Sequence, residues 1–334
     1  MADIAPTKML PALRSREEPL VTVGRPVRQT VGGVPFSIGA WNAAGEELVE
    51  ARFDRGGRAQ IVTPERQEAR LEMAGSFIFG GMLQGHYGHF LLETLARAWA
   101  LIPSAKPIVW LSNDRVTRLR PFHREAFEAL GIDPARHVII HEPTRFERLE
   151  VPEAGAILWR SFHPDHARAI GVLPFGSPVP GKRVWLSRTK VSERKARVWN
   201  EPELEALLIA DGWSVLHPED HSIVGQVAAM QGAETLAGFD GSAFHTVLLA
   251  RDVGARQVII PRGPVDRLTP TFQAISDAKN LERIKLGLEM DHVAGDRRAS
   301  TIVRLRSVEK SFATLRGVVA RRAPAEPPAY TNSR

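Results

Sequence analysis

The sequence predicts an α/β protein whose sheets are largely parallel. Strand-like and helix-like runs alternate along most of the chain, which is the order typical of parallel sheets. The clearest example is residues 234–250, ETLAGFDGSAFHTVLLA, where an apolar run breaks at Gly238 and Gly241 and resumes with helical spacing. With 334 residues, 43% of them hydrophobic, the chain is long enough for two globular domains.

The first half of the chain is expected to begin with short strands. Residues 1–20 are predicted to be poorly ordered. Over residues 20–79, β-like runs such as VTVG and AQIVTP are separated by glycine pairs. From residue 86, HYGHFLLETLARAWALI has the spacing of a helix with one buried stripe. Strand-like PIVWLS, helix-like PFHREAFEALG and strand-like HVIIHE and AILWRS then follow.

A domain boundary is predicted at LPFGSPVPGK, residues 173–182, where Pro and Gly are concentrated. It separates an N-terminal domain, residues 21–175, from a C-terminal domain, residues 176–322. A helix over residues 297–322 is expected to close the second domain. The tail, residues 323–334, is Pro-rich and polar and is predicted to be disordered.

The second domain is expected to alternate strictly between strands and helices. The predicted strands are KRVWLSR, WSVLHPE, TLAGF and RQVIIP. The predicted helices are NEPELEALLIADG, with Asn200 as its N-cap, and SIVGQVAAMQGA, with Ser222 as its N-cap. This spacing of short elements is typical of a Rossmann-like domain.

Composition excludes several classes of protein. The chain has no cysteine, so disulfides, thiolate metal sites and cysteine nucleophiles are excluded. We find no apolar run of signal-peptide or membrane-spanning length, and we therefore expect a cytoplasmic protein. The net charge of +6 favours anionic ligands. The basic residues are scattered rather than interleaved with aromatic residues, which favours phosphorylated small molecules over nucleic acid.

The glycine turn at residues 238–241 is a candidate phosphate site. Glycine permits a sharp turn, and Ser242 stands where a helix N-cap is expected. The amides that follow, from Ala243 to His245, would then face an anion such as a nucleotide phosphate. The alternative is a plain structural turn, since glycine turns between strand and helix are common without any ligand.

A second candidate site lies on the helix that follows Gly85. His89, Glu93 and Arg97 are spaced at i, i+4 and i+8, and His86 precedes His89 by three residues. A carboxylate beside His89 would make this imidazole a general base that accepts a proton from a hydroxyl. The alternative is a surface pair of Glu93 with Arg97 and a structural histidine. Neither the HExxH spacing of a zinc site nor the GxSxG turn of a serine hydrolase is present.

A basic segment, WLSRTKVSERKARVWNE, supplies candidate ligands for a diphosphate. Arg188 directly follows a predicted strand, where ligands of open α/β sheets bind, and could clamp a diphosphate. Lys190 and Lys195 could add charge, although a solvated basic loop is the simpler alternative. Glu219, which follows the next strand, could accept from a ribose hydroxyl or a base edge.

These segments together resemble glycosyltransferase family 61, the capsular polysaccharide biosynthesis type. GHYGHFLLETLARAWAL is similar to that family's N-Y-x-H-[WF]-L-x-[DE]-x-L-P-R segment. Residues 185–250 are similar to its later motifs: an arginine after a strand, N-E-x-E-[LV], P-E-x-[LH]-S-x-x-[ED]-Q and G-x-x-G-[SA]-[AG]-[LF]. Order and spacing agree over roughly half of the chain. Asp240 departs from the pattern, because many members carry histidine or a small residue there, and a carboxylate beside a phosphate-binding turn would repel a diphosphate.

The resemblance implies a GT-B-like fold, in which two Rossmann-like domains face each other across a cleft. It also implies an inverting transfer of a sugar from a nucleotide donor to a saccharide or glycan acceptor, with no catalytic metal. His89 would be the base, oriented by Glu93, with His86 and Arg97 on the acceptor side. The donor diphosphate would be held by Arg188, Lys190, Lys195 and the amides of Gly241, Ser242, Ala243 and His245.

The resemblance further suggests a place in surface polysaccharide synthesis, with the protein cytoplasmic or peripheral at the inner face of the membrane. Two other functions stay open at this point. A GT-B-like sugar-nucleotide epimerase would share the cleft but would hydrolyse or isomerise its donor without an acceptor. A catalytically inactive glycan-binding or nucleotide-sugar-binding protein would leave the donor intact.

Overall fold

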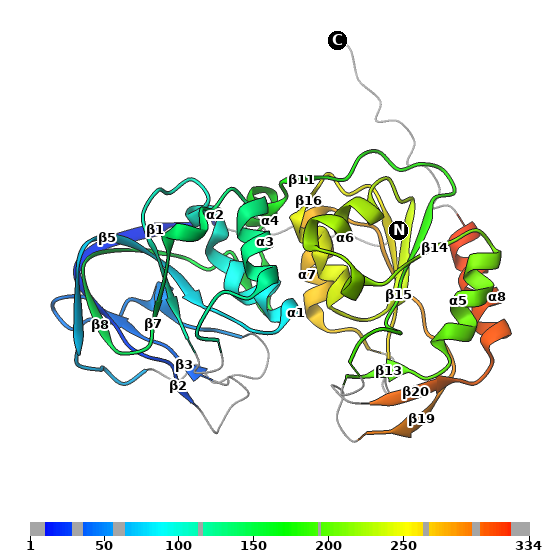
Figure 1. Ribbon diagram of the computed structural model, residues 1–334, viewed down its shortest axis with the longest axis horizontal. Coiled ribbons are helices and arrows are strands. Elements are labelled where there is room, and N and C mark those ends of the chain that lie inside the picture. The colour runs from blue at the N-terminus through cyan, green and yellow to red at the C-terminus, as the bar shows by residue number, and fades with distance from the viewer. Residues whose placement is uncertain are drawn as a thin grey trace, which may run out of the picture.

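The computed structural model describes residues 11–28, 36–55, 64–112, 116–192, 195–262, 267–295 and 301–321. In these residues the chain forms two α/β lobes that lie side by side along its long axis (Figure 1). The N-lobe contains the elements up to α4 (Pro164–Ile170), and the C-lobe those from β11 (Leu173–Pro174) onwards. The predicted α/β class is confirmed. The predicted disordered tail lies outside the described residues, as does the first half of the predicted disordered N-terminus.

The N-lobe is built on a six-stranded mixed sheet in the order β4-β1-β8-β5-β6-β7. Four neighbouring strands, β8, β5, β6 and β7, run parallel, and β1 pairs antiparallel with both β4 and β8. Helix α3 lies where the sequence predicts one. The bounds are β1 (Ser15–Val23), β4 (Ala40–Trp41), β5 (Leu71–Met82), β6 (Ile108–Leu111), α3 (Pro121–Ala129), β7 (His137–Ile140) and β8 (Thr144–Pro152), with short elements β2 (Val27–Arg28), β3 (Phe36–Ser37), η1 (Val49–Ala51), η4 (Pro134–Arg136), β9 (Ala156–Ile157) and β10 (Ser161–Phe162).

Two strands of the N-lobe differ from the sequence-based expectation. Residues 15–20 were expected to be poorly ordered, but they belong to β1, which pairs along its length with β8. Strand β8 itself was not anticipated, because its charged residues mask its pattern of buried alternate positions. The pairing partner of each strand is remote in sequence, so neither strand is recognisable from local signals alone.

The C-lobe is built on a five-stranded, fully parallel sheet in the order β14-β12-β15-β17-β18. Counted along the chain this is the doubly wound order 2-1-3-4-5, whose switch point lies between the neighbours β12 and β15. Ligands of such sheets bind at the carboxyl ends of the strands that flank the switch point. The bounds are β12 (Arg183–Leu186), α5 (Glu201–Ala210), β14 (Ser214–Leu216), η5 (Pro218–Asp220), α6 (Ile223–Met230), β15 (Thr235–Phe239), η6 (Ser242–Leu249), β17 (Arg256–Ile260), α7 (Pro270–Lys279), β18 (Arg283–Lys285) and α8 (Val308–Ala320).

The end of the chain corrects the expected closing helix. Helix α8 starts at Val308 with Ser307 as its N-cap, whereas residues 302–305 form strand β20 (Ile302–Leu305) between β13 (Arg197–Val198) and β19 (Met290–Ala294). Asn200 stands at the N-cap of α5, but its side chain exchanges hydrogen bonds with the backbone of Leu305 and does not cap the helix. Ser222 caps α6 as expected, because its hydroxyl accepts from the amide of Gly225.

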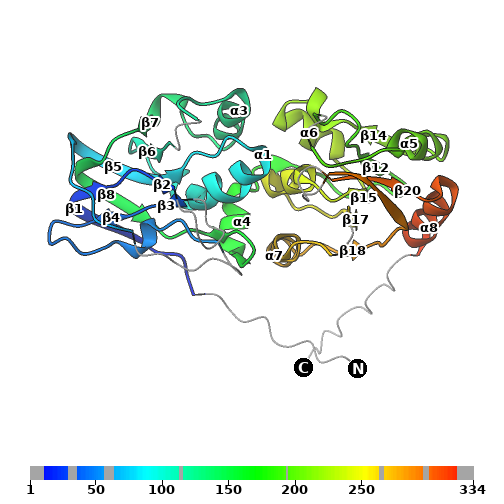
Figure 2. The same ribbon diagram turned by 90° about the horizontal axis from the view of Figure 1, so that it is seen from below.

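The two lobes pack on each other through a shared core. Ile223, Leu248 and Leu249 of the C-lobe belong to the same buried cluster as Phe90 and Leu91 of the N-lobe. The helix turn α1 (Tyr87–His89) lies at this junction (Figure 2). Whether the halves are independent domains divided at residues 175 and 176 stays a prediction. Within the described residues, no helix combines the length and the apolar character needed to cross a bilayer.

Specific contacts fix α1 against the C-lobe. Gly88 lies so close to η6 that an added Cβ would be 2.9 Å from the Cβ of Ser242. The Tyr87 hydroxyl is 2.9 Å from the hydroxyl of Thr246, which in turn donates to Gln226 Oε1. Tyr87 and Thr246 are 159 residues apart in the sequence, and their contact brings the two candidate sites together.

Candidate active site

A cavity of about 290 Å³ lies between the lobes, at the carboxyl ends of β12 and β15. We call it the interlobe cavity. Its wall includes His86, His89, Leu92, Leu158 and Trp159 from the N-lobe and Arg188, Lys195, Asp240, Gly241, Ser242, His245, Arg262 and Thr271 from the C-lobe. An adjoining cavity of about 300 Å³ shares His86, Arg188, Lys195, Gly241 and Ser242 and adds Glu219, Gln226 and Ala243. Most of the residues selected from the sequence therefore meet in one place.

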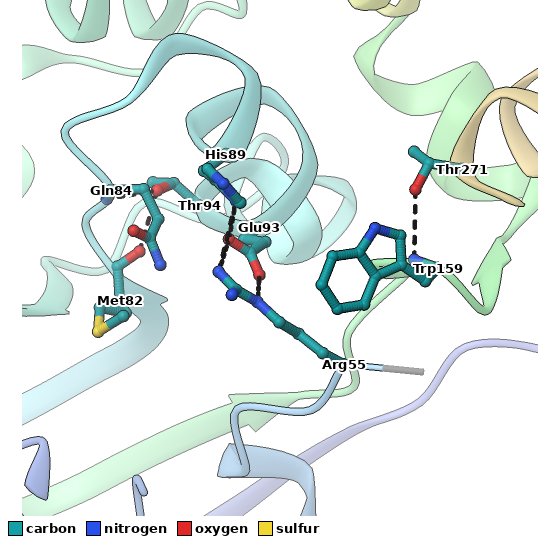
Figure 3. Close-up of polar contacts among 8 residues, drawn as sticks. All are labelled: Arg55, Met82, Gln84, His89, Glu93, Thr94, Trp159 and Thr271. Carbon is teal, nitrogen blue, oxygen red and sulfur yellow. Dashed lines mark hydrogen bonds and ion pairs between the residues drawn. The ribbon is translucent and has the colours of Figure 1, made fainter. Parts of the chain in front are cut away.

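The helical segment that carries His89 changes its pitch three times. After α1, residues 90–94 form a π-helical turn, η2 (Phe90–Thr94), followed by the 3₁₀ turn η3 (Leu95–Arg97) and by α2 (Ala98–Leu101). Thr94 ties this turn to the end of β5, since its hydroxyl accepts from the Gln84 amide and donates to the Met82 carbonyl (Figure 3). The prediction of a single regular helix is therefore wrong. π-Helical turns of this kind are frequent at functional sites.

His89 and Glu93 form the hydrogen-bonded pair that the sequence predicts. His89 Nδ1 lies 2.7 Å from Glu93 Oε2 (Figure 3), and the side chains are 37% and 4% exposed. Because an ionised carboxylate only accepts hydrogen bonds, Nδ1 is the protonated nitrogen of this ring. The other nitrogen, Nε2, is then free to accept a proton, on a ring that lines the interlobe cavity.

Arg55 contacts this pair, although the sequence did not single it out. Its guanidinium binds Glu93 through two hydrogen bonds, of 2.5 Å from Nε and 2.8 Å from Nη2. Nη2 also lies 3.4 Å from His89 Nδ1. Burial by itself would raise the pKa of Glu93, but the hydrogen bonds from His89 and Arg55 outweigh it and lower this pKa. Glu93 is thus an ionised carboxylate beneath the imidazole.

Arg97 does not lie on the face predicted for it. Its guanidinium donates to the carbonyls of Pro152 and Glu50, at 2.9 and 2.6 Å, and stacks on Phe79. Burial lowers its pKa to about 10. The pitch changes after residue 90 turn Arg97 away from His89, and it lines neither the interlobe nor the adjoining cavity. It instead holds the segment that leads to Arg55.

Arg188 extends from the end of β12 to the centre of the C-lobe wall. Its Nη2 donates to the carbonyl of Ala196 at 2.9 Å, and its backbone amide donates to Glu201 Oε1 at 3.0 Å. Burial, and then the nearby charge of Arg262, lower its pKa to about 10, so it is cationic at neutral pH. An added Cβ at Gly241 would overlap Nη1 of Arg188, so a side chain at this position would displace the guanidinium. The φ of −177° at Gly241 is ordinary extended backbone, so close approach explains this glycine.

The structure resolves the orientation of Asp240. Its Oδ1 accepts from both the backbone amide and the Nε of Arg262, each at 2.9 Å. Arg262 also donates to the carbonyl of Ala196, which Arg188 shares. The carboxylate beside the glycine turn is therefore neutralised by a cation that the sequence pattern did not identify.

The helix after the glycine turn differs from its prediction. It is a 3₁₀ helix, η6, whose N-cap is Gly241 and not Ser242. The first backbone hydrogen bond of this helix runs from the amide of Phe244 to the carbonyl of Gly241. The amides of Ser242 and Ala243 come before it in the chain and take no part in this bond. His245 is 8% exposed, and burial lowers its pKa to about 4. Its Nδ1 has no hydrogen-bond partner within the described residues.

The remaining predicted residues divide between the cavities and the surface. The ring of His86 lies 5.3 Å from that of His89, and burial, followed by the charge of Lys195, lowers its pKa to about 4. Lys195 lines both cavities, and Glu219 lines the adjoining one. Lys190 forms an ion pair with Asp220 and lines neither cavity. No group of three potential metal-ligating side chains occurs in the parts of the chain that the structure describes.

A family model described as Glycosyltransferase 61 matches residues 87–254, which is half of the chain. The chain belongs to glycosyltransferase family 61. The matched range contains the His89–Glu93 pair, Arg188 and the glycine turn, whereas Arg55 and Arg262 lie outside it. No curated protein gives a significant match to this chain. Glycosyltransferase family 61 membership supports a glycosyltransferase activity that uses a nucleotide sugar and a glycan.

Proposed function

We propose that this family 61 protein is an inverting, GT-B-type glycosyltransferase. It moves a sugar from a nucleotide donor to a hydroxyl of a saccharide acceptor held between the two lobes. The observation that carries this proposal is the pairing of His89 with Glu93 on one wall of the interlobe cavity and of cations with a glycine turn on the other. A base and an anion-binding wall on opposite sides of one cavity are what a single displacement requires.

In the proposed reaction His89 is the general base. Its Nε2 takes the proton of the acceptor hydroxyl while the oxygen forms a bond to the anomeric carbon of the donor sugar. The bond from that carbon to the diphosphate oxygen breaks on the opposite side, and the nucleoside diphosphate leaves with the electron pair. Glu93 stabilises the imidazolium that forms, and Arg55 keeps Glu93 ionised.

The leaving diphosphate is assigned to the C-lobe wall. Arg188 and Lys195 supply positive charge, and the amides of Ser242 and Ala243 supply hydrogen-bond donors. Because Arg262 neutralises Asp240, the wall keeps a net positive charge. These groups balance the charge of the departing group in our proposal, and no resident metal is assigned.

We also assign the reaction to surface polysaccharide synthesis of the capsular type, at the cytoplasmic side of the membrane. This assignment rests on the resemblance of the two motif regions to that type. Fractionation of cells that express the tagged chain tests the location, and loss of surface glycan on deletion of the gene tests the pathway. A chain recovered from the periplasm, or a glycan coat that deletion leaves intact, would contradict the assignment.

The experiment for the proposed activity begins with binding. Thermal shift of the purified chain with UDP-, GDP-, CMP- and dTDP-sugars identifies the nucleotide, because a ligand that binds the native state raises its stability. Transfer to glycan acceptors is then compared between the wild type, His89→Ala and Lys190→Ala. We expect His89→Ala to slow transfer by at least about 100-fold and Lys190→Ala, outside both cavities, to preserve it.

Other outcomes point to other functions. Donor turnover that needs no acceptor would favour an epimerase. Nucleotide binding without any turnover would favour a binding protein. If none of the nucleotide sugars stabilises the protein, the proposed phosphate site is wrong.

A further inference from the structure

Trp159 has a backbone conformation that is unusual for a bulky residue. Its φ is +65°, in the left-handed region that glycine favours and that costs other residues free energy. Two contacts hold it there: its amide donates to Thr271 Oγ1 of the C-lobe at 3.3 Å, and the preceding Leu158 pairs with Arg55 in a β-bridge. Strain of this kind persists where the surroundings impose it, and such positions cluster at ligand-binding sites.

The indole of Trp159 lies beside the catalytic pair. It is half-buried and forms part of the wall of the interlobe cavity. The guanidinium carbon of Arg55 lies 5.9 Å from the indole centroid, and the same guanidinium binds Glu93 (Figure 3). One arginine therefore contacts both the aromatic ring and the carboxylate that orients His89.

The walls of the interlobe cavity differ in chemistry. The C-lobe wall carries Arg188, Lys195 and Arg262, which suit the phosphates of a donor. The N-lobe wall adds the apolar lining residues Leu92, Leu158 and Trp159. An uncharged sugar ring fits this side of the cavity better than a diphosphate does. Its C–H face can cover the indole while its hydroxyls remain at the polar edge of the cavity.

We propose that Trp159 is the platform on which the acceptor sugar stacks, so that its reacting hydroxyl lies over Nε2 of His89. This inference rests on the proposed transferase function and adds to it a specific acceptor subsite for a saccharide ring. Because indole is rigid and its place is set by Arg55 and Thr271, the platform is formed before the acceptor binds. The strained backbone is the cost of presenting the ring at this position.

The test compares four variants: Trp159→Ala, Trp159→Gly, Trp159→Phe and Trp199→Ala. Trp199 is the matched control, since it is 60% exposed and its ring also faces an arginine, Arg197 at 5.8 Å, but it does not line the cavity. Initial rates with p-nitrophenyl glycosides of common hexoses and pentoses give separate KM values for acceptor and donor. The melting temperature of each variant is recorded beside them.

We expect Trp159→Ala and Trp159→Gly to raise the acceptor KM equally, by about tenfold or more, with a donor KM within about twofold of the wild type. Trp159→Phe keeps most of the acceptor affinity, and Trp199→Ala has no effect. The glycine variant melts at a higher temperature than the alanine variant, because only glycine tolerates the left-handed backbone. An equal rise in acceptor KM in two variants that differ in melting temperature would show that the loss reflects binding and not folding.

Three results would overturn the platform. They are an unchanged acceptor KM in Trp159→Ala, a rise confined to the donor KM, and losses that follow melting temperature across the variants. If the wild type transfers no sugar, saturation-transfer NMR with the same glycosides decides the inference separately. Binding that is lost in Trp159→Ala and kept in Trp199→Ala then supports a saccharide platform although the transferase proposal has failed, and absence of glycoside binding to the wild type rejects it.

Discussion

Asp240 and Arg262 form an ion pair, 2.9 Å between Oδ1 and Nε, beside the turn that we assign to the donor diphosphate. Both side chains are almost fully buried, at 6% and 11% exposed. The pair explains how an acidic residue can stand next to a phosphate-binding turn without repelling its ligand. Arg262 lies beyond the residues matched by the family model, which end at 254, so the donor site that we propose is not confined to the matched range.

Removal of Arg262 should therefore weaken donor binding through Asp240. We expect Arg262→Ala to reduce the affinity for the nucleoside diphosphate by about tenfold, because the carboxylate then repels the phosphates. Titration calorimetry with the nucleoside diphosphate that stabilises the wild type measures the change. In the double variant Asp240→Asn/Arg262→Ala most of this loss should be recovered. An equal loss in the double variant would show that Arg262 acts by direct contact alone.

Substitutions at Gly241 and at Arg188 should weaken donor binding in the same way. Gly241→Ala places a Cβ on Nη1 of Arg188 and displaces the guanidinium, so it should resemble Arg188→Ala. We expect both variants to bind the nucleoside diphosphate about 10- to 100-fold more weakly, as the loss of a charge-assisted contact implies. The Lys190→Ala variant, at the surface pair with Asp220, serves as the control and should bind normally. Normal binding by Gly241→Ala would show that Arg188 does not hold the ligand.

Arg55→Ala should move the pH dependence of transfer. Without this guanidinium, burial and the remaining hydrogen bond from His89 alone set the pKa of Glu93, which must rise. Protonation of Glu93 then begins at a higher pH, so the acid limb of the kcat/KM profile should shift to higher pH. Arg55→Lys should restore part of the shift, and Arg52→Ala, whose partner is Glu47, should show none. A uniform loss of rate at every pH would contradict the positioning role.

Glu201 should make the fold less stable as pH rises. Burial raises the pKa of this carboxyl to about 8, against an ordinary value of 4.5. Between these values the unfolded chain has lost the proton that the native chain keeps, so the free energy of unfolding decreases with increasing pH. Glu201→Gln keeps the acceptor oxygen for Arg188 and Trp185 but cannot ionise. Urea titrations measure the free energy of unfolding of this variant relative to the wild type. This difference should be more favourable to the variant at about pH 8 than at about pH 5, by at least about 1 kcal/mol. A constant difference would reject this cause.

Local signals revealed the parts of the site that depend on spacing. His89 and Glu93 are four residues apart, so the period of a helix indicated this pair. Arg188 and Gly241 each follow a predicted strand, so the strand ends indicated them. Arg55 is 38 residues from Glu93 and Arg262 is 22 from Asp240, and no local pattern announces such contacts. Trp159 meets Thr271 across 112 residues.

The error at Arg97 has a different cause. Extrapolation of a regular helix through residues 90–97 cannot anticipate a π-helical turn followed by a 3₁₀ turn. The same holds for residues 302–305, whose apolar spacing suits a helix but whose backbone pairs with β13 and β19 as a strand. In both places tertiary hydrogen bonds override a local preference.

The most direct test of the account is the His89→Ala variant, measured for transfer and for nucleotide binding in one preparation. We expect kcat to fall by about 10²- to 10⁴-fold, the usual contribution of a general base, while the affinity for the nucleoside diphosphate stays unchanged. Turnover equal to that of the wild type would contradict the assignment of the base, and with it the proposed mechanism.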